Sequence, residues 1–361
     1  MCKERRGPAE RLEAAGLATL YSLYKSVKGA GRPLQPDAEG LHRQGADRDW
    51  NESLYFNFTD PEKRIGGYTR IGLLPNQHSD VGVIMIYAGG GRLLFTQQEG
   101  RAARSDGGLG MAGLSFRCLE PLWRWRLSYQ GEMADLPDSR MLKEAGPDLM
   151  GRIPVSLDIT FEGLSPPFNF KNADPGALAG MMVSRGTRLR DIFGVSRIST
   201  EHYEQACWCR GKISIDGAEI EIRGSGHRDH SWGVRDWTAP RLWTWLTCQF
   251  SDEVAFNLTR VAIRSVDVFN GFICRQGRNY PVRAAELETE FEDDGVTQRI
   301  FRFRMEDTGG ARLEVEGRAL WVIPLDLSNR GYATLVNEAM AEFRWEGRVG
   351  YGIAEYLHQL S

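Results

Sequence analysis

The sequence predicts a mostly β protein built from two antiparallel, barrel-like halves. Three observations lead to this fold class. About fifteen short runs have strand character, whereas only one stretch has a clear helical period. The turns between these runs are short and rich in glycine and aspartate. The chain has 361 residues, which is long for one domain and comfortable for two.

The order of the elements divides the chain into three parts. Residues 1–49 should form an N-terminal helix and a linker, because apolar residues recur at helical spacing until Gly29 and Pro33 end the pattern. Residues 50–195 should form the first barrel, which begins with the alternating LYFNF segment. Residues 196–361 should form the second barrel. Its segments HYEQACWCRGKISI and AEIEIRG flank an Asp-Gly pair and predict a hairpin.

The segment RLWTWLTCQF in the second half is apolar on both faces of its predicted strand. Leu242, Leu246 and Phe250 share one face, and Trp243 and Trp245 share the other. Such a strand must be covered on both sides. Either one face packs on the other half while the second lines an apolar pocket, or two ordinary packed cores leave no cavity.

Charge and hydropathy limit the partners and the location. The chain has 45 basic and 48 acidic residues, which argues against nucleic acid as the main partner. No stretch approaches the roughly 20 apolar residues of a membrane span. The N-terminus lacks the apolar core of a signal peptide. We therefore expect a cytoplasmic protein, and the apolar faces of the segment RLWTWLTCQF favour a hydrophobic small molecule as its partner. A peripheral membrane contact and the oligomeric state stay open.

Ionisable residues are concentrated in the segment Gly226–Trp237, directly after a predicted strand. They are too dense for an ordinary core strand unless they are paired. In extended geometry the side chains alternate between two faces. One face carries Arg228, His230 and Trp232, and the other carries His227, Asp229 and Ser231.

Several interpretations of this segment compete. A zinc site from His227 and His230 is disfavoured, because residues three apart on a strand point to opposite sides, and the cysteines lack C-x-x-C spacing. A catalytic triad through Ser231 and His230 is disfavoured, because adjacent side chains cannot easily face each other. A structural polar cluster at a barrel mouth and a catalytic or ligand-orienting site both remain. We predict no metal and no cofactor.

The motif RDHSWG in this segment resembles that of a known family. The stretches NESLYFNF, GGYTRIGLLPN, HYEQ and GRVGYGIAEYLHQ accompany it. Together they resemble the carotenoid 1,2-hydratase (hydroxyneurosporene synthase) and AttH-like family, and its bacterial members in particular, from about Trp50 to Gln359. The resemblance implies two lipocalin-like barrels of the calycin type. It also places His230 and Trp232 on the D-H-x-W core of the family motif.

The resemblance implies the chemistry of hydratases and cyclases, with one departure. The hydratases are thought to use a Tyr and an Asp on the strands after the motif. The segment VAFNLTRV in that region has Phe256, Asn257 and Thr259 instead. The resemblance therefore does not extend to that pair.

These features predict a cofactor-free lyase or isomerase, a hydratase or cyclase, that acts by acid–base chemistry on an apolar isoprenoid or polycyclic substrate. A carboxyl group in a dry pocket can keep its proton near neutrality and protonate an alkene. The predicted catalytic residues are Asp229, His230, Trp232 and Asp236, with the two aspartates as acid candidates. The predicted substrate-binding residues are Trp237, Trp243, Trp245, Tyr203, Glu204 and Arg228, of which Glu204 is the next acid candidate.

Two expectations make this hypothesis testable. His230→Ala and Trp232→Phe should abolish or sharply reduce activity and leave the fold intact. The alternative from another class of protein is a non-catalytic, lipocalin-like carrier of a hydrophobic small molecule. A carrier needs no abnormally titrating group in its pocket, whereas an acid catalyst does.

Overall fold

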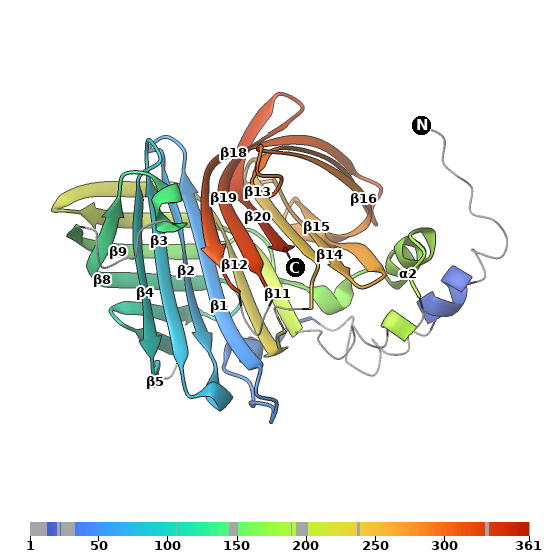
Figure 1. Cartoon of the computed structure of the whole chain (residues 1–361), viewed down its shortest axis with the longest axis horizontal. Helices are drawn as coiled ribbons and strands as arrows, with labels where there is room; N and C mark the ends of the chain where they lie inside the picture. The colour runs from blue at the N-terminus through green and yellow to red at the C-terminus, as the bar shows by residue number, and fades with distance from the viewer. Residues whose placement is uncertain are drawn as a thin grey trace.

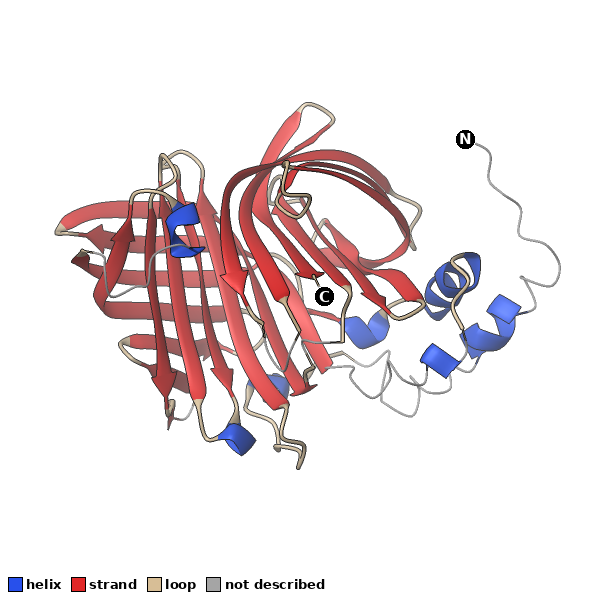
Figure 2. Cartoon of the chain, in the orientation of Figure 1, coloured by secondary structure: helices blue, strands red, loops and turns tan. Residues whose placement is uncertain are grey.

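The computed structural model shows two bodies of β-structure side by side (Figures 1 and 2). Both bodies consist of antiparallel strands, and the helices are few and short, so the predicted fold class is confirmed. The structure describes residues 13–19, 22, 33–105, 107–143, 151–188, 190–192, 201–236, 239–328 and 332–360.

The first body is a 12-stranded antiparallel sheet. Strand β9 pairs with both β8 and β11, so the pairings through β1, β2, β3, β4, β8, β9, β11 and β12 return to their start and form a barrel. The strands are β1 (Trp50–Asp60), β2 (Ile65–Leu73), β3 (Asp80–Ala88), β4 (Leu93–Gly100), β5 (Ala103–Ser105), β6 (Gly108–Met111), β7 (Leu114–Glu120), β8 (Arg124–Leu136), β9 (Arg152–Gly163), β10 (Phe168–Asn169), β11 (Glu201–Ile215) and β12 (Ala218–Val234).

The second body is a closed barrel in which each strand pairs with the next and β20 pairs back with β13. Its interior holds an apolar cluster with several phenylalanines. The strands are β13 (Leu242–Gln249), β14 (Val254–Ile263), β15 (Val266–Arg275), β16 (Arg278–Phe291), β17 (Gln298–Asp307), β18 (Arg312–Asp326), β19 (Thr334–Trp345) and β20 (Arg348–Gln359).

The division between the two bodies differs from the predicted one. We expected residues 196–361 to form the second barrel, but β11 and β12 belong to the first. The reason is that β12 pairs with β1 along its length, from Trp50 opposite Val234 to Thr59 opposite Ser225. The hairpin that carries RDHSWG therefore completes the first barrel, and the second barrel begins with β13.

The predicted hairpin between β11 and β12 is confirmed. Asp216 and Gly217 form its two-residue turn, with φ values of 50° and 82°. Positive φ at both central residues is the geometry that matches the twist of the flanking strands, and Asp-Gly favours it.

Within the described ranges, helical structure is found in short segments. Residues 13–19 and 22 are helical, and the rest of the predicted N-terminal helix lies outside the described residues. Helix α2 (Pro175–Ser184) begins after Asp174, whose side chain accepts a hydrogen bond from the backbone of Ala177. Among the described residues, no helix is long and apolar enough to cross a membrane. The 3-10 turns are η1 (Pro36–Glu39), η2 (Pro75–Gln77), η3 (Ser139–Lys143) and η5 (Phe170–Asn172).

The barrels pack through an apolar cluster contributed by both. Trp245, Met340 and Ile353 of the second barrel contact buried aromatic and aliphatic side chains on β1 to β4 of the first. Gly66 on β2 permits this approach, because a Cβ at this position would collide with the end of the Met340 side chain. This contact brings one wall of each barrel together, and a cavity lies along the interface.

Candidate functional site

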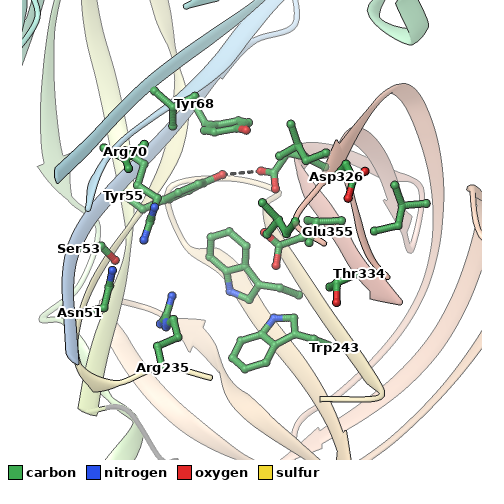
Figure 3. Close-up of a pocket in the computed structure, with 18 of the residues that line it drawn as sticks. Asn51, Ser53, Tyr55, Tyr68, Arg70, Arg235, Trp243, Asp326, Thr334 and Glu355 are labelled. Atoms are coloured by element: carbon green, nitrogen blue, oxygen red, sulfur yellow. Dashed lines mark hydrogen bonds between the residues drawn. The ribbon is translucent and has the colours of Figure 1, made fainter. Parts of the chain in front are cut away.

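A cavity of about 800 Å³ lies between the two barrels. Its size is within the range of roughly 300–1,000 Å³ that small-molecule pockets take. One wall comes from β1 to β4, β11 and β12, and the other comes from β13 and β18 to β20 (Figure 3). A pocket is therefore present, and it lies between the barrels.

The two tryptophans of β13 help to line this cavity. Trp243 and Trp245 face it, and Trp245 also packs against the first barrel. Leu246 and Cys248 point into the interior of the second barrel. A single face of β13 therefore both packs on the partner barrel and lines the pocket, while the other face belongs to the barrel core.

A pair of glutamates forms the acidic part of the cavity wall. Glu338 on β19 and Glu355 on β20 are directly opposite each other in the strand register, and both line the cavity. Burial raises the pKa of Glu338 well above its ordinary value of 4.5, and the charge of Glu355 adds to the effect. Burial also raises the pKa of Glu355. Two adjacent buried carboxyl groups cannot easily both ionise, so the pair keeps a shared proton.

Tyr55 of the first barrel contacts this pair. Its hydroxyl donates a hydrogen bond of 2.6 Å to Oε1 of Glu338. Burial, followed by the charge of Glu338, raises the pKa of Tyr55 well above 10.0, so the phenol stays a donor. Tyr68 stacks on Tyr55, with ring centroids 5.4 Å apart. The carboxyl pair therefore meets an aromatic wall, as Figure 3 shows for Tyr55 and Tyr68.

A second carboxylate, Glu204 on β11, lies on the cavity wall and joins the barrels. Its Oε2 atom is 2.7 Å from Nε2 of His227. The same oxygen accepts hydrogen bonds from Trp245 Nε1 at 3.1 Å and Asn257 Nδ2 at 2.7 Å. Burial opposes ionisation of Glu204, but the hydrogen bonds from His202 and His227 outweigh it and lower the pKa. Glu204 is therefore a carboxylate, whereas the pair on β19 and β20 is not fully ionised.

Asp229 and Asp236 both line the cavity, as their predicted role in the site requires. Burial raises the pKa of Asp229, although the nearby His202 and Arg235 act in the opposite direction. Arg235 donates a hydrogen bond of 3.0 Å to the hydroxyl of Ser231. Asp229 is thus a third carboxyl group with a raised pKa, on the wall opposite the glutamate pair.

The other face of β12 points away from the cavity. Arg228 donates to both carboxylate oxygens of Glu39, at 2.8 and 3.1 Å, and to Oε1 of Gln205 at 2.6 Å. The hydroxyl of Tyr203 donates to Glu39 at 2.7 Å and lies 3.0 Å from Nδ1 of His230. All of these side chains are buried. This face therefore binds η1, which carries Glu39, to the first barrel.

Glu52 continues this network toward the start of β1. Its Oε1 atom is 3.0 Å from Nε2 of His230 and 2.8 Å from Nδ1 of His42. The His42 ring stacks on Trp232, with centroids 3.7 Å apart. Burial raises the pKa of Glu52, but the hydrogen bonds from His230 and His42 outweigh this, so its pKa is lowered. His230 and Trp232 of the D-H-x-W core therefore hold the segment before β1 against the first barrel.

The structure separates the predicted site residues into two groups. The alternation predicted for β12 is correct: Asp229 faces the cavity, whereas Arg228, His230 and Trp232 face away from it. The residues on the cavity are Asp229, Asp236, Glu204, Trp243 and Trp245. The residues in the buried network on the other face are Tyr203, Arg228, His230 and Trp232. Trp237 lies outside the described residues.

Sequence reasoning missed Glu338, Glu355, Tyr55 and Arg70, all of which line the cavity. A signal for the two glutamates was present. Each lies beside apolar neighbours that predict burial, Ala339 and Met340 after Glu338, and Ile353 and Ala354 before Glu355, and a buried acidic residue needs a partner. Neither strand gives any indication that the two residues are opposite each other.

Two groups of side chains have the composition of metal sites. His42, Glu52 and His230 bring three donor atoms within 4.8 Å of one another, and His202, Glu204 and Asp229 do the same. In the first group the same Glu52 oxygen contacts both histidines. The donors of the first group are therefore already engaged with one another.

Comparison with known proteins gives a family and a fold. A family model described as a domain of unknown function (DUF7064) matches residues 35–360. No curated protein matches the sequence. A crystal structure from Nitrosomonas europaea, provisionally named AttH, is 14% identical with a TM-score of 0.61, over 91% of this chain and 98% of that one. The structure of CghA with Sch210972 is 10% identical with a TM-score of 0.53, over 86% of this chain and 89% of that one.

The similarity to the AttH structure agrees with the AttH-like fold that the sequence motifs imply. At these identities it concerns the fold alone. The family match begins just before η1 and ends beyond β20, so it includes the network around Glu39 as well as both walls of the cavity. Since it spans both barrels, the chain belongs to the family described as a domain of unknown function (DUF7064).

Proposed function

We propose that this protein is a cofactor-free lyase or isomerase, of the hydratase or cyclase type, which protonates an alkene of an apolar isoprenoid or polycyclic substrate. The cavity between the barrels would hold the substrate. The observation that carries the proposal is the carboxyl pair of Glu338 and Glu355 on its wall, with Tyr55 donating to the first.

Alkene protonation requires a strong acid that is still protonated at the working pH. An ordinary exposed glutamate is ionised near neutrality. Burial raises the pKa of Glu338, and the charge of Glu355 raises it further. The pair therefore provides a proton donor without a cofactor, as in other enzymes that hold a carboxylic acid in an apolar site.

The aromatic side chains of the cavity suit the cation that protonation creates. Tyr55, Tyr68, Trp243 and Trp245 line the same space as the glutamate pair. Each cation–π contact contributes roughly 0.5–2 kcal/mol, with the larger value where the cation is shielded from water. Such an environment favours the carbocation over the neutral alkene, which is the differential stabilisation that catalysis needs.

The opposite wall offers groups that could complete the reaction. A carbocation must lose a proton or take up water, and a carboxylate or a histidine can accept the proton released. Asp229, Asp236 and the Glu204–His202 pair line this wall. We assign Asp229 and Asp236 to this side of the reaction and Glu338 to the first proton transfer.

His230 and Trp232 take a different role in this proposal. Both belong to the network that binds the segment before β1. Because Asp229 lies between Arg228 and His230 in the chain, the anchoring of its neighbours fixes the direction in which its side chain points. His230 and Trp232 are therefore positioning residues.

The shared fold is compatible with ligand binding. CghA has a similar fold, and its structure was determined with Sch210972. The similarity adds no residue role, since the two sequences are 10% identical. The argument for acid chemistry therefore depends on this chain's own carboxyl pair.

Deuterium transfer from solvent to substrate tests the proposal. The protein is incubated in D2O with a panel of isoprenoid and polycyclic alkenes and with any ligand that co-purifies. A deuteron from the carboxyl pair would add to the double bond. The cation would then lose a proton from a neighbouring carbon or bind water, and solvent would return a deuteron to the pair. Each turnover leaves deuterium on carbon, which mass spectrometry detects.

The expected result is labelling by the wild type and a rate roughly 10²- to 10⁴-fold lower in Glu338→Gln. The exposed Glu288 on β16 provides the matched control, and Glu288→Gln should label like the wild type. A co-purifying ligand recovered unlabelled, with no labelling across the panel, would instead identify the protein as a carrier.

A further inference from the structure

Two arginines extend into the cavity from the first barrel. Arg70 is on β2, where it lies opposite Tyr55 in the strand register, and Arg235 follows directly after β12. Both line the cavity, and Figure 3 shows them on the side that carries Asn51 and Ser53, across from Glu355. Both side chains are half-buried, so the repulsion between the two cations is screened less than it would be at the surface.

Arg70 has no partner that explains its position. Within the described part of the chain, its guanidinium group makes no hydrogen bond and has no carboxylate oxygen within the 4.0 Å of an ion pair. Burial and then repulsion from Arg235 lower its pKa to about 10, so it remains charged at neutral pH. A half-buried cation that is not paired within the protein is a ready site for an external anion.

The remainder of the cavity gives the ligand its other property. Val83, Met85 and Phe95 of the first barrel and Leu325 and Val336 of the second line an apolar region. At the arginine end, Asn51 and Ser53 add neutral polar groups (Figure 3), and the Asp229 carboxyl, whose pKa burial raises, lies near both arginines without an ion pair to Arg70. The walls therefore suit a molecule with an apolar body and one charged end.

We propose that Arg70 and Arg235 form an anion-binding subsite that holds an oxyanion, such as a carboxylate, at one end of an otherwise apolar substrate. The inference rests on the proposed function, in that it takes the cavity as the substrate site. Binding the charged end on the first barrel would direct the apolar body toward the second, where Glu338 and Glu355 lie. The subsite would thereby select substrates and fix which double bond meets the acid.

Binding of two matched fluorescent probes tests the subsite. The first is 1-anilinonaphthalene-8-sulfonate, which has an apolar body and one oxyanion. The second is N-phenyl-1-naphthylamine, which has the same ring system without the charge. Dissociation constants are measured by fluorescence titration for the wild type, Arg70→Gln, Arg235→Gln and the control Arg117→Gln, which removes an exposed arginine on β7. Circular dichroism verifies that each variant is folded.

We expect the wild type to bind the sulfonate more tightly than the neutral amine. Arg70→Gln should weaken sulfonate binding roughly 10- to 100-fold, as loss of a charged hydrogen bond does. The same variant should change amine binding by less than about 3-fold, and Arg117→Gln should change neither. Equal affinity for the two probes, no sulfonate binding, or sulfonate affinity unaffected by Arg70→Gln would each overturn the subsite.

The experiment also distinguishes the subsite from the proposed reaction. Glu338→Gln should retain sulfonate binding, since it leaves both arginines in place. If sulfonate binding depends on Arg70 while no alkene is labelled in D2O, the anion subsite stands and the catalytic proposal fails. If alkenes are labelled but Arg70→Gln leaves sulfonate binding unchanged, the catalytic proposal stands and the anion subsite fails.

Discussion

Tyr55 and Glu338 belong to different barrels and are 283 positions apart in the chain, yet they share a hydrogen bond of 2.6 Å. Glu338 is also opposite Glu355 on the neighbouring strand. The contact between the barrels is therefore linked to the protonation of the carboxyl pair. Loss of the shared proton would put two negative charges into the interface, where burial makes them costly.

The first prediction concerns the pH dependence of stability. The pKa of Glu338 is raised above 4.5 in the folded protein, chiefly by burial. The folded state therefore holds a proton that the unfolded chain releases above about pH 4.5. Its stabilising effect is complete below that pH and is lost as the pH rises through the folded pKa. Glu338→Gln removes this titration, so its melting temperature should decrease less between about pH 5 and pH 9.

Melting curves at several pH values for the wild type, Glu338→Gln and Glu288→Gln are the measurement. Glu288 is exposed, so Glu288→Gln should follow the wild type at each pH. If Glu338→Gln loses as much stability with rising pH as the wild type does, the shared proton is not held by this pair.

The sequence was sufficient for local structure because local structure depends on neighbouring residues. The turn at Asp216 and Gly217 and the two faces of β12 follow from residue type and a period of two. The apolar faces around Trp243 and Trp245 also predicted that β13 is covered on both sides. Each of these features is decided within a few positions along the chain.

The pairing of distant strands could not be predicted in the same way. Ser53 and Ser231 contact each other through their hydroxyl groups although 178 positions separate them. No local pattern in the sequence indicates that β12 pairs with β1 and completes the first barrel. The predicted boundary between the two barrels at residue 196 was therefore misplaced. The same limit applies to Glu338 and Glu355, since β19 and β20 had to be paired in register before their carboxyl groups could be seen as neighbours.

The second prediction concerns metal. Although His42, Glu52 and His230 could supply three ligands, the same Glu52 oxygen already contacts both rings, so a metal would have to displace these hydrogen bonds. Elemental analysis of the purified protein should find far less than one zinc or iron ion per chain, and dialysis against EDTA should leave the melting temperature unchanged. A stoichiometric metal that EDTA removes with a loss of stability would contradict this.

The third prediction revises the role of His230. The motif alone suggested that His230→Ala abolishes activity and leaves the fold intact. In the structure His230 contacts Tyr203 and Glu52 on the face away from the cavity. Its loss leaves the buried Glu52 short of a partner, which should cost about 1–3 kcal/mol in the free energy of unfolding.

Urea unfolding of His230→Ala measures this cost, with His78→Asn as the control. His78 is exposed, and its φ of 59° is one that asparagine tolerates. Unchanged stability of His230→Ala together with complete loss of alkene labelling would instead support a catalytic histidine. Trp232→Phe should behave like His230→Ala but more mildly, because phenylalanine can still stack on His42.

The last prediction concerns the buried ion pair between Arg228 and Glu39. Both side chains are buried, and the guanidinium group contacts both carboxylate oxygens. Burial opposes ionisation of Glu39, but the charge of Arg228 together with the hydrogen bonds from Arg228, Tyr203 and the Leu122 backbone outweighs it and lowers the pKa. Arg228→Ala should therefore reduce the free energy of unfolding by about 3–5 kcal/mol. Arg126→Ala breaks an exposed pair with Asp158 and should have little effect.

The pH dependence separates the ion pair from simple packing. Because the pKa of Glu39 is lowered in the folded protein, its contribution is present above the unfolded value of about 4.5 and is lost as the pH falls through the folded pKa. The loss of stability that Arg228→Ala causes relative to the wild type should thus be largest near neutral pH and much smaller in acid.

A double-mutant cycle tests the pairing itself. Arg228→Met combined with Glu39→Leu should be more stable than either single variant, because no buried charge is left unpaired. Additive losses in that cycle would mean that the two residues stabilise the protein independently, and that the motif does not fasten η1 through this pair.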